Sequence, residues 1–144
     1  NAFKLTAVFF CYLAIVAAQQ SGAEQFQPSQ YVGNWFEIYR TQNMPFEKGT
    51  NIVANYQPKT SNSVYVNNYE FLPDENRWQA AHGDAIIEDL NMPARLGVKF
   101  YALQPRANYN VLYTDYTQVS VVYSYEELFF GLWEIKYGWI LSRT

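Results

Sequence analysis

The chain has 144 residues, which predicts a single domain. Aromatic residues make up 19% of it, and tyrosine, with 13 copies, is the commonest of them, which favours strands and pocket linings. Only 16% of the residues are charged and the net charge is −3 with no basic stripe, so the composition excludes a disordered acidic chain and argues against a nucleic-acid partner.

The first residues indicate a secretory signal peptide. Lys4 precedes an almost wholly apolar run from Leu5 to Ala18, which ends in the small side chains that a signal peptidase reads. A membrane anchor is the alternative, but the run is short because a spanning helix takes roughly 20 residues. We therefore assign residues 1–18 to a signal peptide and predict a secreted, extracellular protein.

The rest of the chain divides into a short linker and a β domain. Residues 19–32 are polar and contain Pro28, which predicts a linker or a one-turn helix. From residue 33 to 144, short alternating runs are separated by turn residues at intervals of about 8 to 12 residues, as in an all-β sandwich or barrel. We expect strands at residues 34–41, 50–57, 63–71, 77–87, 94–103, 109–115, 118–125 and 135–142, with a stop at Pro58 and an ambiguous stretch at 126–134. Eight antiparallel strands in hairpin order suit an up-and-down barrel, whose interior admits one small ligand.

Alternation along each strand indicates which side chains point into the barrel. The inward positions mix large side chains with alanines and a glycine, which favours an open cavity; large neighbours that fill the gaps are the alternative. No inward position in the clearest strands is basic, which disfavours a buried salt bridge to a fatty-acid carboxylate. The predicted ligand-binding residues are Ala54, Tyr56, Val66, Asn68, Gln79, Ala81, Val98, Phe100, Tyr109, Val111, Tyr113, Tyr137 and Trp139.

The polar members of this set allow two interpretations. Their side chains could orient a ligand hydroxyl or carboxylate by hydrogen bonding. Alternatively, the tyrosines could satisfy one another around trapped water. The sequence leaves both open.

Three short motifs carry a family resemblance: Gly33-Asn34-Trp35 in the first predicted strand, Thr114-Asp115-Tyr116 after the sixth, and Arg143 after the eighth. They resemble the G-x-W motif, the T-D-Y turn and the final arginine of the lipocalins, and within them the branch of apolipoprotein D and the bacterial outer-membrane lipocalins. Each motif is weak alone, but their order and spacing together are specific. The resemblance covers about residues 26 to 144 and includes longer pieces such as NWFEIYR and NVLYTDY.

The resemblance implies both a fold and a function. It implies a barrel floor at Trp35 with the Arg143 guanidinium stacked on the indole, and a turn in which Asp115 accepts backbone N–H bonds. It also implies a carrier of a small hydrophobic molecule: a fatty acid, sterol or steroid, retinoid, bilin or lysolipid. A protein-binding lipocalin that acts through its open-end loops, as an inhibitor or a ligand trap, is the alternative.

The sequence departs from the family in two respects that affect the fold. Asn51, Tyr125 and Glu127 stand where apolipoprotein D carries cysteines, so those disulfides are not expected here. The chain stops at Thr144, directly after the eighth predicted strand, so we expect a fragment in which the C-terminal helix of the lipocalins is truncated.

The segment before the last strand is unusually apolar. It contains Leu128, Phe129, Phe130, Leu132 and Trp133. Similar loops in apolipoprotein D-like proteins suggest a contact with a membrane or a lipoprotein particle. The alternatives are a buried hairpin end and a surface left bare by the missing C-terminal helix.

Catalytic chemistry finds little support in the sequence. The single cysteine, Cys11, lies in the signal peptide, and a lone histidine without cysteine excludes a good zinc site. That histidine, His82, alternates with inward positions and should point outward. Glu37 could face inward near the floor, but one carboxylate makes no mechanism. We therefore predict a binding protein and not an enzyme, without a cofactor or a metal.

Overall fold

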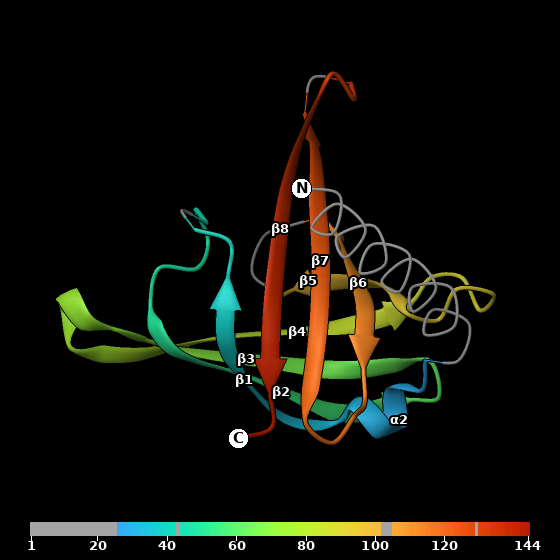
Figure 1. Cartoon of the computed structure of the whole chain (residues 1–144), viewed down its shortest axis with the longest axis horizontal. Helices are drawn as coiled ribbons and strands as arrows, with labels where there is room; N and C mark the ends of the chain where they lie inside the picture. The colour runs from blue at the N-terminus through green and yellow to red at the C-terminus, as the bar shows by residue number, and fades with distance from the viewer. Residues whose placement is uncertain (1–25, 43, 102–104, 129) are drawn as a thin grey trace, which may run out of the picture.

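Eight antiparallel strands close into a barrel in the order β1 to β8, with β8 paired back to β1 (Figure 1). The computed structural model describes residues 26–42, 44–101, 105–128 and 130–144, so the predicted signal peptide lies outside the described residues. The strands are β1 Gly33–Arg40, β2 Thr50–Thr60, β3 Ser63–Leu72, β4 Arg77–Ile87, β5 Arg95–Phe100, β6 Ala107–Thr114, β7 Val119–Leu128 and β8 Trp133–Ser142. The predicted all-β up-and-down barrel is therefore confirmed.

Two short helical elements accompany the strands. The one-turn helix α2 (Pro28–Tyr31) lies at one end of the barrel, and the 3₁₀ turn η1 (Pro73–Glu75) joins β3 to β4 (Figure 1). Within the part of the chain that the structure describes, no helix has the length and apolar character needed to cross a bilayer.

Predicted strand bounds differ from the structure by three residues at three places. β2 runs through Pro58 to Thr60 instead of stopping, and it can do so because β1 begins only at Gly33, opposite Tyr56, which leaves β2 with one neighbour beyond that point. β5 ends at Phe100, short of residue 103, and residues 102–104 lie outside the described residues. The ambiguous stretch 126–134 belongs to a long hairpin, since β7 continues to residue 128 and β8 begins at residue 133.

The closed end of the barrel is built around Trp35. Its side chain is fully buried, its indole N–H donates to the Tyr31 carbonyl at 2.9 Å, and its ring stacks on that of Tyr31 at 5.0 Å. The Arg143 guanidinium lies 3.8 Å from the centre of the Trp35 ring, as the resemblance implied. Gly33 has φ +98°, and a Cβ there would lie 3.1 Å from Arg143 Nη1, so this position favours glycine for both conformation and space.

The turn between β6 and β7 is held by Asp115. One carboxylate oxygen accepts the backbone N–H groups of Thr117, Gln118 and Val119 at 2.8 to 3.1 Å. These bonds favour the ionised carboxylate and lower the pKa of Asp115 below its usual value. The T-D-Y motif is therefore a turn device, as the resemblance implied.

Replacement of Trp35 by alanine tests the role of this residue as the floor. We expect Trp35→Ala to lower the free energy of unfolding by about 3–5 kcal/mol, because a large buried ring is lost and the barrel end cannot collapse into the space. Trp78→Ala is the matched control, since Trp78 is 56% exposed and its loss should cost about 1 kcal/mol or less. Urea denaturation measures both, and equal losses would mean that Trp35 does not close the barrel.

Candidate functional site

The strand register shows which side chains share the inner face, because directly opposed residues point the same way. Ala54, Asn68 and Ala81 form one row across β2, β3 and β4. Of the predicted ligand-binding residues, all but one lie on this inner face: Ala54, Tyr56, Val66, Asn68, Gln79, Ala81, Val98, Phe100, Tyr109, Val111, Tyr137 and Trp139. An inward orientation alone does not identify which of these side chains border free space.

The prediction that Tyr113 faces inward is wrong. The ladder between β6 and β7 pairs Val111 with Val122 and then Tyr113 with Val121, so Leu112 is an extra residue in a β-bulge. The bulge turns Tyr113 to the outer face, where it is 46% exposed. Simple alternation from Val111 therefore predicts the wrong direction for the side chains that follow the bulge at Leu112.

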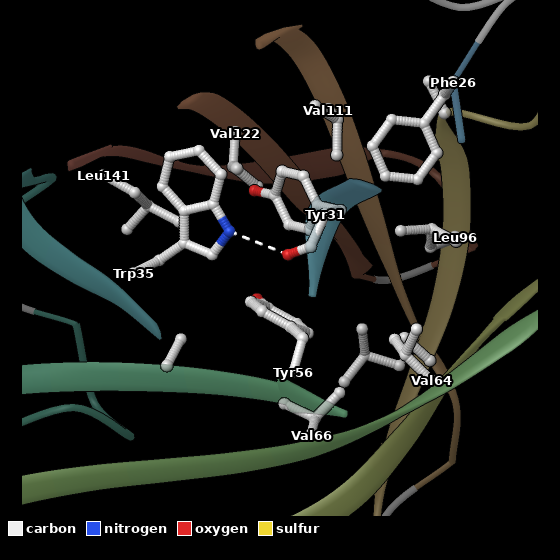
Figure 2. Close-up of a cluster of buried hydrophobic side chains, with 14 residues drawn as sticks. Phe26, Tyr31, Trp35, Tyr56, Val64, Val66, Leu96, Val111, Val122 and Leu141 are labelled. Carbon is white, nitrogen blue, oxygen red and sulfur yellow. Dashed lines mark hydrogen bonds between the residues drawn. The ribbon is translucent and has the colours of Figure 1, made fainter. Parts of the chain in front are cut away.

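The closed half of the interior is filled by side chains. Tyr31, carried by α2, projects between Trp35 and Tyr56, and apolar side chains surround the three rings (Figure 2). Val66 and Val111 belong to this packed cluster and are nearly inaccessible. A void beside Tyr31 and Tyr56 is about the size of a water molecule. This half has no room for a hydrophobic ligand.

The buried tyrosine hydroxyls bind one another. Tyr56 and Tyr109 hydroxyls are 2.8 Å apart, Tyr31 lies 3.5 Å from Tyr109, and Tyr31 meets the Ser120 hydroxyl at 2.7 Å. Burial raises the pKa of Tyr31 to about 12 and raises the pKa values of Tyr56 and Tyr109 well above 10, so all three remain neutral. Tyr56 and Tyr109 thus follow the second interpretation of the sequence, in which tyrosines satisfy each other.

The opposite half of the interior, which we call the mouth, is open to solvent. Ala81 faces inward beside Asn68 yet is exposed, and Gln79, Phe100 and Trp139 are only half-buried. Solvent therefore reaches the inner face at Ala81, two residues before the β4–β5 pairing begins at Gly83.

Charged side chains line one side of the mouth. Opposite β8, β1 has a bulge at Ile38, so Glu37 pairs with Leu141 and Arg40 pairs with Trp139, and both charged residues face inward. Arg40 Nη1 lies 3.2 Å from Glu37 Oε1. Glu37 thus faces inward, but toward the mouth and not near the floor.

The loop between β1 and β2 adds Glu47 to this group. Its Oε2 accepts the Trp139 indole N–H at 2.9 Å and lies 4.0 Å from Arg40 Nη1. Phe46 packs edge-on against Tyr137, with ring centres 5.0 Å apart. The sequence analysis missed Arg40 because simple alternation along the strand places its side chain outside the barrel. It missed Glu47 because alternation does not predict side-chain direction in a loop.

Burial changes the acid strength of this group. It raises the pKa of Glu37 to about 7, with a second contribution from the negative charge of Glu47, and the positive charge of Arg40 acts in the opposite direction. Burial also raises the pKa of Glu47. Among the described residues, no group donates a hydrogen bond to Glu37 Oε2.

The outer surface carries the other predicted features. His82 is exposed, as predicted, and its Nδ1 lies 2.7 Å from Asn67 Oδ1. The side chains of Phe130, Leu132 and Trp133 project from the tip of the β7–β8 hairpin with 108%, 80% and 70% of their surface exposed. Leu128 is half-buried, and Phe129 lies outside the described residues. A search of residues 26–42, 44–101, 105–128 and 130–144 finds no group of three side chains suited to a metal ion.

The raised pKa of Glu37 predicts how stability varies with pH. A carboxyl whose pKa is about 7 in the folded protein and 4.5 otherwise stabilises the fold fully below pH 4.5, and this contribution is lost as the pH rises through 7. Glu37→Gln should therefore flatten the fall in the denaturant midpoint over this range. Glu75→Gln, at an exposed turn, is the control and should leave the slope unchanged. An unchanged slope in Glu37→Gln would contradict the assignment.

Comparisons with known proteins agree with this geometry. Residues 27–144 match the family model of the lipocalin-like domain. Apolipoprotein D of Cavia porcellus is 41% identical over 121 residues, which are 84% of this chain and 62% of that protein. The outer membrane lipoprotein Blc of Escherichia coli (strain K12) is 28% identical over 83% of this chain and 63% of its own length. The chain thus spans less than two thirds of these relatives.

Solved structures show the same fold. Insecticyanin from the tobacco hornworm Manduca sexta superposes with a TM-score of 0.72 at 20% sequence identity, over 85% of this chain and 66% of that one. Lobster apocrustacyanin A1 superposes with a TM-score of 0.67 at 19% identity, over 81% of this chain and 62% of that one. The family model, the barrel and the stacked Trp35–Arg143 pair lead to one conclusion: the chain belongs to the lipocalin family.

Proposed function

We propose that the protein is an extracellular carrier of a small hydrophobic molecule, which it holds in the mouth half of the barrel. The observation that carries this proposal is the contrast between the two halves of the interior. Aromatic rings fill the closed half, whereas inward-facing Ala81, Phe100 and Trp139 remain accessible from solvent. Secretion rests on the signal-peptide pattern of residues 1–18.

The mouth offers the mixture that hydrophobic carriers use. Apolar rings and small side chains provide contact area, and a few polar groups orient the ligand. Burial of roughly 400 Å² of apolar ligand surface at about 25 cal/mol/Å² contributes about 10 kcal/mol. Association and ordering oppose this term, so we expect micromolar or somewhat tighter dissociation constants.

Membership of the lipocalin family supports the carrier over an enzyme or a protein-binding module. The family resemblance implies sterols or steroids, fatty acids, retinoids, bilins and lysolipids as candidate ligands. The mouth residues that we expect to contact them are Ala54, Asn68, Gln79, Ala81, Phe100, Tyr137 and Trp139.

A ligand titration with a blocked variant tests the carrier function. We expect a ligand of one of these classes to quench tryptophan fluorescence saturably, and Trp139→Phe to remove most of the signal. Ala81→Phe should weaken binding at least tenfold, because a ring at this position fills the mouth. Ala80→Phe is the control, since Ala80 is exposed and pairs with outward-facing Tyr69.

Two outcomes would contradict this proposal. Equal affinities in Ala81→Phe and Ala80→Phe would place the ligand outside the mouth. A folded protein that binds no member of the panel would favour the protein-binding alternative, which a pull-down with the same protein would then test.

We also propose that the tip of the β7–β8 hairpin contacts lipid surfaces. Three large apolar side chains, Phe130, Leu132 and Trp133, are exposed together there, and burial of such side chains in a lipid interface is favourable. Glu126, Glu127 and Glu134 flank the tip, so anionic lipids should not strengthen the contact.

Vesicle binding tests the role of this tip. We expect the protein to co-sediment with phosphatidylcholine vesicles and to bind no better to vesicles that contain phosphatidylserine. The double variant Phe130→Ser, Trp133→Ser should lose most of this binding, whereas Trp78→Ser, at an exposed site on β4, should retain it. Retention of binding by the double variant would exclude the tip as the contact.

A further inference from the structure

Two buried acceptors on the inner face have no hydrogen-bond donor among the residues that the structure describes. They are Oε2 of Glu37, whose side chain is only 10% exposed, and Oδ1 of Asn68. Glu37 comes from β1 and Asn68 from β3, with β2 between them. Buried acceptors are nearly always satisfied in folded proteins, so each of these two atoms can accept a hydrogen bond from a bound molecule.

The charge of the mouth shows which kind of donor fits. Three carboxyl groups, those of Glu37, Glu47 and Glu70, lie on this side of the mouth: the charge of Glu47 raises the pKa of Glu37, and the charge of Glu70 raises the pKa of Glu47. The one cation among them, Arg40, is already engaged: its guanidinium lies 3.2 Å from Glu37 Oε1 and donates to the Gly49 carbonyl at 3.0 Å. An anionic head group would meet net repulsion here, whereas a cation would be attracted.

Aromatic rings lie beside these carboxyl groups. The rings of Tyr137 and Trp139 have centres 6.3 Å apart, and Phe46 lies 5.0 Å from the first and 6.5 Å from the second. The Glu47 carboxylate holds the Trp139 indole by its N–H. Aromatic faces attract organic cations and also offer apolar contact to the carbon atoms next to the charge.

Resting on the carrier function above, we propose that the mouth selects an amphipathic amine. The protonated amino group donates hydrogen bonds to Glu37 and to Asn68 or Glu47, and the aliphatic part lies against Trp139, Phe100 and Ala81. The ligand class is a primary amine with a hydrophobic body, and not a carboxylate of the same length.

The free protein holds a proton where the ammonium group would bind. Burial, with a second contribution from the negative charge of Glu47, raises the pKa of Glu37 to about 7, so this carboxyl is largely protonated below pH 7. Arg40 and Glu70 are the other charged groups that face Glu37 and Glu47. Binding of an ammonium should therefore expel the proton, and affinity for an amine should rise as the pH increases through 7.

A matched ligand series tests this selection. Dodecylamine, dodecanol and dodecanoate share one chain, so differences in affinity report the head group. At pH 8 we expect the amine to bind about tenfold more tightly than the alcohol, the gain of one charge-assisted hydrogen bond, and the carboxylate to bind most weakly. At pH 5.5 the advantage of the amine should shrink, because the proton on the Glu37 carboxyl must then be displaced.

Variants identify the groups that provide the selection. Glu37→Gln should remove the preference for dodecylamine over dodecanol and the pH dependence of that preference. Glu47→Gln should also remove the preference for the amine, and it provides the test if Glu37→Gln does not fold. Glu75→Gln, on the exposed η1 turn, is the matched control and should behave as the parent protein.

Proton release provides a readout that a merely structural role would not change. Calorimetry at pH 6.5 in two buffers of different ionisation enthalpy should show that the protein releases a proton on binding dodecylamine and none on binding dodecanol. Equal binding of all three ligands, or tighter binding of dodecanoate, would overturn the amine proposal and leave the carrier function intact. Binding of none of them by a folded protein that also binds no sterol or retinoid would instead contradict the carrier function itself.

Discussion

The stacking of Arg143 on Trp35 is the contact on which the closed end of the barrel depends. It joins the end of the chain to β1, with the guanidinium 3.8 Å from the ring centre. The same guanidinium donates to the carbonyls of Tyr116 and Asn34, so the β6–β7 turn is held to the same point. Trp35 in turn supports Tyr31, which brings α2 across the end of the barrel. Loss of this one contact would loosen both termini of the described barrel together.

The side chains that fill the closed half of the barrel determine where a ligand can bind. Because Tyr31, Tyr56 and Tyr109 occupy the closed half and satisfy one another's hydroxyls, only the mouth retains accessible inner surface. The bulge in β1 then turns Arg40 into this space beside Glu37, where an aliphatic residue would have been cheaper to bury. The fold thus combines a filled floor with a polar and acidic mouth, and this asymmetry is the physical basis for the proposed selectivity.

The sequence predicted the barrel and its floor well because both depend on local patterns. The eight strands predicted from alternation and the predicted contact between Trp35 and Arg143 are both present in the structure. The prediction of which side chains point inward failed where a β-bulge inserts one residue, because the bulge turns Tyr113 outward and Arg40 inward. A bulge cannot be recognised from the alternation of apolar and polar residues. The partner of a buried hydroxyl is equally invisible to alternation, since it comes from another strand, so the bonding of Tyr56 to its neighbours needed the structure.

A crystal structure of the protein with its tightest-binding ligand tests the central claim most directly, namely that the floor is filled and the mouth binds. The account predicts ligand density between Trp139 and Ala81, with the hydrogen-bonded tyrosines and α2 undisturbed. Ligand density between Tyr31 and Tyr56, with α2 displaced, would show that the floor is the binding site and would contradict the account. Density on the outer surface of the barrel would contradict it as well.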